Sequence, residues 1–111
     1  MPADDKKRAA QRGLVDRVLN GAGMASVQQR ARAFRNEGLA PPLDALVGKV
    51  ATRPTQINDA DFSAARAAGF SEDQLFELVV CAAVGQSTRL YEAGLAALSS
   101  ATGDGRPDHA A

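Results

Sequence analysis

The sequence predicts an all-α protein in which about five helices pack around one long central helix. Three observations support this fold class. The 111 residues are rich in alanine and include only four phenylalanines, one tyrosine and no tryptophan. No window shows the sustained alternation of apolar and polar residues that marks a half-buried strand. Between Ser71 and Ser99 no proline interrupts an apolar stretch long enough for one helix of about 42 Å.

Length and composition indicate one domain. A chain of this size buries about two-thirds of its unfolded surface. We expect a helical domain over residues 9–100, a flexible, polar N-terminus over residues 1–8, and a disordered tail over residues 101–111 that has nothing apolar to bury. The charged N-terminus does not resemble a signal peptide, and no apolar run reaches the ~20 residues of a membrane span. We therefore expect a cytoplasmic protein with no membrane contact.

The charges balance overall but are distributed unevenly. Residues 1–40 hold eight basic and four acidic residues, whereas the remainder hold five and nine. Such halves could attract each other within or between subunits, although a solvated helix face is the simpler interpretation. The densest basic segment contains Arg30, Arg32 and Arg35, with only Phe34 as an aromatic neighbour. Because the net charge is also zero, nucleic-acid binding is not expected.

Two helices are expected in the first 40 residues. The first covers about residues 9–19, where apolar residues form one stripe, and glycines at 21 and 23 end it. The apolar residues of this first helix are Leu14, Val15, Val18 and Leu19. The second pattern covers Met24–Glu37, where apolar residues recur every three or four positions and Gly38 follows as a C-terminal glycine.

Two shorter helices are expected next. Pro41 and Pro42 force a turn and precede a helix that ends near residues 53–54, because proline is tolerated in a first helical turn. Asn58 is a typical N-cap for a helix that ends at Gly69. Phe70 then provides a hydrophobic staple before the long helix.

The long helix begins with a capping box, because Ser71 is followed three residues later by Gln74. Its first half is apolar nearly all round, which is typical of a buried helix. A chain of this length has little material to cover such a helix, so we expect other copies to pack against it. The expected interface residues are Leu75, Phe76, Val79, Val80 and Ala83. Within the same helix, Gly85 marks either a close approach of another backbone or a kink.

The run from Ile57 to Gln86, together with the ending Arg89–Leu98, resembles the alkylhydroperoxidase-D-like, or carboxymuconolactone decarboxylase-like, superfamily. In that group a short helix ends in an Ala-Gly turn, a Ser-x-(Asp/Glu) cap follows, and a long helix rich in alanine and valine comes next. The resemblance covers roughly residues 43–98. It implies an all-α fold that assembles as trimers, hexamers or related oligomers.

Peroxidase members of that superfamily carry Cys-x-x-Cys followed by histidine before the Ala-Gly turn. Counted back from Gly69, these positions fall at about Pro54, Ile57 and Asp61. Disulfide cycling needs an attacking thiolate and a resolving thiol, and these residues supply neither. The resemblance therefore implies a member without peroxidase chemistry at that position, and no residue of the decarboxylase branch is carried over.

The remaining candidates for chemistry are few. Cys81 is the single cysteine, so no intrachain disulfide forms, and its apolar neighbours predict a small buried side chain with a raised pKa. His109, the single histidine, lies in the C-terminal tail and cannot organise a metal site or a catalytic dyad. We expect neither a metal nor a cofactor.

A set of polar residues could form a small-molecule pocket. On the long helix, Gln86, Arg89 and Glu92 are i, i+3 neighbours. The simpler interpretation is an ion-pair network with Arg66 or Arg53. The functional interpretation is a pocket with Arg89 as an anion anchor. The weak catalytic candidates are Arg66, Gln86, Arg89, Tyr91 and Glu92.

These observations favour a non-catalytic helical protein that acts as a homo-oligomer or as a small accessory subunit of a partner enzyme. The alternative is a carboxymuconolactone decarboxylase-like enzyme that acts on a small lactone or carboxylic acid without a redox cysteine pair. It would use the polar set as acid, base and anion-binding groups. Thiol chemistry at Cys81 is a weaker third possibility.

Overall fold

The computed structural model describes residues 2–102, with side chains from residue 6 onward, and this part of the chain is helical without any strand. The helices are α1 (Pro2–Asn20), α2 (Val27–Arg35), α3 (Leu43–Thr52), α4 (Asp59–Ala67) and α5 (Glu72–Thr102), with a 3₁₀ turn η1 (Pro54–Gln56). The predicted all-α class is confirmed, with five helices in this part of the chain, of which four pack against the long helix α5.

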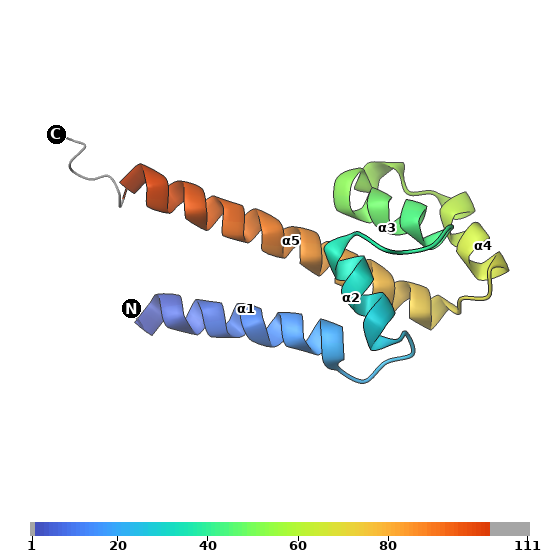
Figure 1. Ribbon diagram of the computed structural model, residues 1–111, viewed down its shortest axis with the longest axis horizontal. Coiled ribbons are helices and arrows are strands. Elements are labelled where there is room, and N and C mark those ends of the chain that lie inside the picture. The colour runs from blue at the N-terminus through green and yellow to red at the C-terminus, as the bar shows by residue number, and fades with distance from the viewer. Residues whose placement is uncertain (1, 103–111) are drawn as a thin grey trace.

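The helix α5 runs along most of the length of the molecule, and the other helices pack against different parts of it (Figure 1). α2, α3 and α4 gather around its N-terminal half, whereas α1 lies beside its C-terminal half. We call α1 together with residues 87–102 of α5 the arm. The molecule measures 61 × 28 × 21 Å, and its radius of gyration is 17.5 Å. A compact chain of this length would have a radius of about 13 Å, so the arm makes the molecule elongated.

The start of α5 is fixed by the predicted capping box. The Ser71 N–H donates to Gln74 Oε1 at 2.8 Å, and the Gln74 N–H donates to Ser71 Oγ at 3.1 Å. These bonds satisfy two of the N–H groups that the first turn of a helix leaves without partners. The helix then continues through Thr102, slightly beyond the predicted Ser99.

The first two helices have different limits from those expected. α1 includes residues 2–8, which we expected to be flexible, since it begins at Pro2 and contains good helix formers. α2 begins at Val27 rather than Met24 because Ser26 caps it and accepts the Gln29 N–H at 3.0 Å. It ends at Arg35 because Asn36 adopts the left-handed conformation that we expected of Gly38.

The pair α3 and α4 is held by a second predicted cap. Asn58 accepts from the N–H groups of Ala60 and Asp61, and the Asp61 carboxylate accepts the Asn58 N–H at 2.9 Å. The same carboxylate accepts from Lys49 Nζ at 3.0 Å, which joins α4 to α3. These hydrogen bonds, first that from Asn58 and then that from Lys49, lower the pKa of Asp61.

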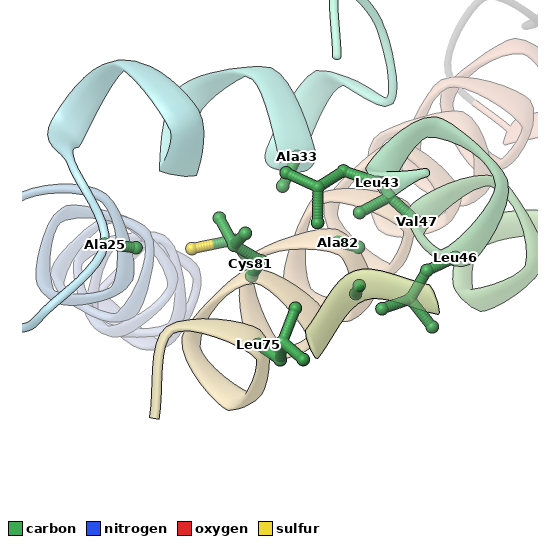
Figure 2. Close-up of a cluster of buried hydrophobic side chains, with 10 residues drawn as sticks. Ala25, Ala33, Leu43, Leu46, Val47, Leu75, Cys81 and Ala82 are labelled. Carbon is green, nitrogen blue, oxygen red and sulfur yellow. The ribbon is translucent and has the colours of Figure 1, made fainter. Parts of the chain in front are cut away.

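The core lies between α5 and the helices on one side of it (Figure 2). Its buried members come from the loop before α2 and from every helix after it. They are Ala25, Ala33, Leu43, Leu46, Val47, Ala65, Leu75, Leu78, Cys81 and Ala82. The first half of α5 is therefore buried along one side only, whereas its composition had suggested burial all round. The opposite side, which includes Phe76, faces outward.

The position of Gly85 is explained by α2. A Cβ atom at Gly85 would lie 2.7 Å from the carbonyl carbon of Phe34 and 2.9 Å from its Cα atom. Of the two interpretations of this glycine, the close approach of another backbone is therefore confirmed. Gly94, by contrast, has no such neighbour within 4 Å.

Candidate functional site

The polar residues of α5 begin with an arginine that holds the end of α2. Arg89 Nη1 donates to the carbonyl oxygen of Phe34 at 2.7 Å, and its Nε and Nη2 donate to Gln86 Oε1 at 3.3 and 3.0 Å. Phe34 lies in the last turn of α2, where carbonyl groups lack helical partners and favour a cation. The guanidinium group of Arg89 therefore has a structural role in joining α2 to α5.

A groove runs between α1 and α5 along the arm. It has a volume of about 520 Å³, and Gln11, Asp16, Thr88, Arg89 and Glu92 are among the residues that line it. Gln11 Nε2 donates to Thr88 Oγ1 at 2.9 Å, which ties the two helices together. A smaller adjoining hollow of about 170 Å³ is lined by Tyr91 and Glu92. Of the five predicted polar residues, Arg89, Tyr91 and Glu92 thus line the groove or the adjoining hollow, and Gln86 is hydrogen-bonded to Arg89.

Arg66 does not belong to this group. It lies on α4, at the other end of the molecule from the arm (Figure 1), and lines an apolar hollow of about 340 Å³ beside Phe62, Phe76 and Val79. Among the described side chains, salt bridges join Arg35 to Glu37 and Lys49 to Asp61. The expected network of α5 with Arg66 or Arg53 is therefore not found in this part of the chain.

The predicted interface residues fall into three groups by exposure. Phe76, with 70% of its surface exposed, and Ala83 face outward, and Val79 and Val80 are half-buried. Leu75, at 2% exposure, belongs to the core of the chain itself. Large apolar side chains that the prediction did not include are also exposed. They include Met24 at 65%, Leu90 at 63% and Leu98 at 59%.

The thiol of Cys81 lies in the core, as predicted. The residue is 1% exposed, and its sulfur points toward Ala25 (Figure 2). Sγ donates to the carbonyl oxygen of Val18 at 3.2 Å. Burial raises the pKa of this thiol, so that little thiolate forms near neutral pH. This environment does not favour a nucleophile.

His109 and the predicted tail from residue 103 onward lie outside the described residues. Among the side chains of residues 6–102, no three histidine, cysteine, aspartate or glutamate residues come together as a metal site would require. None of the helices in this range combines the length and apolar character needed to cross a membrane.

A glutamate that the sequence interpretation did not explain holds the loop between α1 and α2. The Glu77 carboxylate accepts the Ala25 N–H at 2.7 Å and the Met24 N–H at 2.8 and 2.9 Å. These two N–H groups, Ala25 first, lower the pKa of Glu77, and the positive charge of Arg30 lowers it further. The signal in the sequence was a carboxylate between two apolar residues, which must find donors if its helix packs.

Arg30 holds the same loop from the side of α2. Its Nη1 donates to the Gly21 carbonyl oxygen at 2.7 Å. We expected this residue to lie on a solvated basic face, but it is 6% exposed, and its buried Nε has no hydrogen-bond partner. Arg30 and Glu77 therefore form a polar cluster beneath the loop, within the otherwise apolar surroundings of Cys81.

Comparisons of the chain with models of protein families, with curated proteins and with solved structures give no match.

Proposed function

We propose that this chain is a non-catalytic, alkylhydroperoxidase-D-like helical protein that acts as a homo-oligomer. One observation carries the proposal: an apolar stripe on α5 that the chain itself leaves exposed. Phe76, Ala83, Leu90 and Ala97 recur every seven residues, and all four are exposed. A seven-residue repeat keeps side chains on one face of a helix, and such a face packs against another helix. We call these four residues the stripe.

The stripe has small neighbours that allow a second backbone to approach. Ser87 and Gly94 lie on the same face, four residues after Ala83 and Leu90, and a Cβ at Gly94 would have open space around it. If two copies of α5 pack antiparallel with their crossing centred at the level of residue 85, Phe76 of each copy faces Gly94 of the other. The bulky ring then meets the residue that leaves most room, so the face is self-complementary, as a two-fold interface requires.

The uneven distribution of charge along the chain also favours a second copy as the partner. The first 40 residues carry an excess of four positive charges and the remainder an equal excess of negative ones. In the antiparallel arrangement, Lys6, Lys7 and Arg8 of α1 lie toward the acidic beginning of α5, which contains Glu72 and Asp73. Complementary charges of this kind favour one orientation over others. A second copy therefore fits the exposed face better than a partner of unspecified chemistry.

The alternative, an enzyme for a small lactone or carboxylic acid, has less support. Arg66 lies apart from the other polar candidates, and Arg89 is bonded to Phe34 and Gln86. The attachment of the chain to a partner enzyme has no separate observation in its favour, so the proposal is confined to self-association.

The proposal is tested by size-exclusion chromatography with light scattering on the full chain at micromolar concentration. We expect a mass above 11.5 kDa for the wild type. Leu90→Glu should lower this mass to that of the monomer, because it places a charge in the stripe. Met24→Glu is the matched control, since Met24 is equally exposed but lies in a loop outside the stripe. A monomeric wild type, or equal effects of the two substitutions, would refute the proposal.

A further inference from the structure

The cluster of Arg30 and Glu77 lines a cavity that lies beside the assembly face and shares Phe76 with it. The cavity has a volume of about 110 Å³ and lies beneath the loop between α1 and α2. Its polar lining consists of Arg17, Arg30 and Glu77, and its apolar lining consists of Val18, Ala22, Phe76 and Val80. A water molecule takes about 30 Å³ of liquid, so the cavity has room for about four groups of that size.

Arg30 gives the cavity its chemistry. A guanidinium group has five N–H donors. Among the described hydrogen bonds of the Arg30 side chain, only Nη1 donates, and its acceptor is the Gly21 carbonyl oxygen. The side chain is more than nine-tenths buried, and its Nε has no hydrogen-bond partner. A buried charge with unused donors is costly unless an acceptor of opposite charge compensates it.

Glu77 does not supply this acceptor. Its carboxylate attracts Arg30 at a distance, but both of its oxygens are bonded to the Met24 and Ala25 N–H groups. The direct ion pairs of the described side chains are Arg35–Glu37 and Lys49–Asp61, both elsewhere. Because Nε is fully buried, the donor of Arg30 that is left for a group entering the cavity is Nη2, which has no described acceptor.

The charge of the lining indicates which group would enter. Arg17 and Arg30 contribute two positive charges and Glu77 one negative charge, so the site as a whole carries a single positive charge. Arg17 is exposed, and none of the described hydrogen bonds involves its side chain, so it can turn toward a ligand. A monoanion balances this charge, whereas a dianion would meet the carboxylate of Glu77 at close range.

We propose that this cavity binds a small monocarboxylate with a hydrocarbon chain of about two to four carbons, a size set by the cavity volume. The carboxylate accepts from Arg30 and Arg17, because guanidinium groups bind carboxylates through paired N–H donors. The hydrocarbon part lies against Val18, Ala22 and Val80. The inference goes beyond the proposed self-association, because both arginines that bind the carboxylate lie outside the stripe, which shares only Phe76 with the lining of the cavity.

The test is a titration of the full chain with butyrate, followed by NMR of the arginine Nε–H signals at constant ionic strength. We expect a saturable shift of the Arg30 signal. Butyrate should bind at least about tenfold more weakly to Arg30→Met, which removes charge-assisted hydrogen bonds. Arg35→Met is the matched control, because it removes one exposed positive charge from the same helix. It should leave the affinity for butyrate unchanged.

Arg17→Gln keeps the test decisive if Arg30→Met does not fold, because Arg17 is exposed. It should weaken butyrate binding severalfold, whereas Leu90→Glu, which tests self-association, should not change it. The inference is overturned if butyrate gives no saturable shift, or if neither arginine substitution weakens its binding. It is also overturned if inorganic phosphate binds as tightly as butyrate, since the site would then not select a monocarboxylate.

Discussion

The carboxylate of Glu77 accepts the backbone N–H of Ala25 at 2.7 Å, across 52 residues of sequence. This bond joins the second turn of α5 to the loop that leads into α2. The neighbouring Met24 N–H donates to the same carboxylate. A single side chain thus satisfies two backbone donors of a loop with no regular structure, and it fixes where α2 begins to cross α5.

Glu77→Gln should destabilise the protein by about 2–3 kcal/mol, because hydrogen bonds to a charged group are worth more than those to an amide. Glu92→Gln serves as the control, since Glu92 is exposed and none of the described side-chain hydrogen bonds involves it. The control should change the free energy of unfolding by less than about 0.5 kcal/mol. Urea denaturation of both variants at pH 7 measures the difference. Equal stability of the two variants would mean that Glu77 does not hold the loop.

The same carboxylate predicts how stability depends on pH. Its pKa is lowered in the folded chain by the Ala25 and Met24 N–H groups. A group with a lowered pKa stabilises the fold above its unfolded pKa, about 4.3 for glutamate. This stability is lost as the pH falls through the folded pKa. The free energy of unfolding should therefore decrease below about pH 5.

The Glu77→Gln variant separates this effect from that of Asp61. The pKa of Asp61 is also lowered, first by the Asn58 N–H and then by Lys49, so both carboxylates contribute in the same direction. Urea denaturation between pH 7 and pH 3 should show a shallower loss of stability for Glu77→Gln than for the wild type. Parallel curves for the two proteins would contradict the assignment.

The parts of the fold that were predicted correctly depend on residues close in sequence. The caps at Ser71 and Asn58 each join residues three positions apart, so spacing alone indicates them. The limits of α2 were wrong because Ser26 and Asn36 competed successfully with Met24 and Gly38 as the ends of the helix. Both signals were present in the sequence, but the apolar periodicity suggested a longer helix.

The polar cluster could not be predicted from spacing. Arg30 and Glu77 are 47 positions apart and meet only because α2 crosses α5. In the sequence Arg30 is one of several arginines on a helix, and nothing distinguishes it from the exposed Arg32 and Arg35. The prediction that Arg66 would lie with the other polar candidates was wrong for the same reason. Helical periodicity places a residue on a face, but it does not specify which helix covers that face.

The crossing of α2 over α5 makes Gly85 sensitive to substitution. Gly85→Ala would place a Cβ atom against the backbone of Phe34, which cannot rotate away. We expect a loss of about 3 kcal/mol or more, at the upper end of the cost of overpacking. Gly13→Ala is the control, since its Cβ would meet only the side-chain end of Arg17 at 3.8 Å, and it should gain up to about 1 kcal/mol in helix propensity. Thermal denaturation distinguishes the two.

The thiol of Cys81 should be inert in the folded chain. Burial excludes reagents and raises its pKa, and its proton is donated to the Val18 carbonyl oxygen. Reaction with an aromatic disulfide at pH 8 should be about 100-fold slower, or more, than in urea, because it requires local opening of the core. Comparable rates in the two conditions would show that the sulfur is accessible and would revive the hypothesis of thiol chemistry.

The antiparallel packing of two α5 helices predicts a specific cross-link. Phe76 of one copy should face Gly94 of the other, so a Phe76→Cys, Gly94→Cys double variant in a Cys81→Ser background should form intermolecular disulfides on mild oxidation. A disulfide requires Cα atoms about 4.4–6.8 Å apart, which only this pairing of the two positions provides. Phe76→Cys alone, in the same background, is the control and should remain uncross-linked, because the two residues 76 lie at opposite ends of the interface. Non-reducing electrophoresis measures the yield, and efficient cross-linking of the single variant would instead indicate a parallel pairing of the stripes.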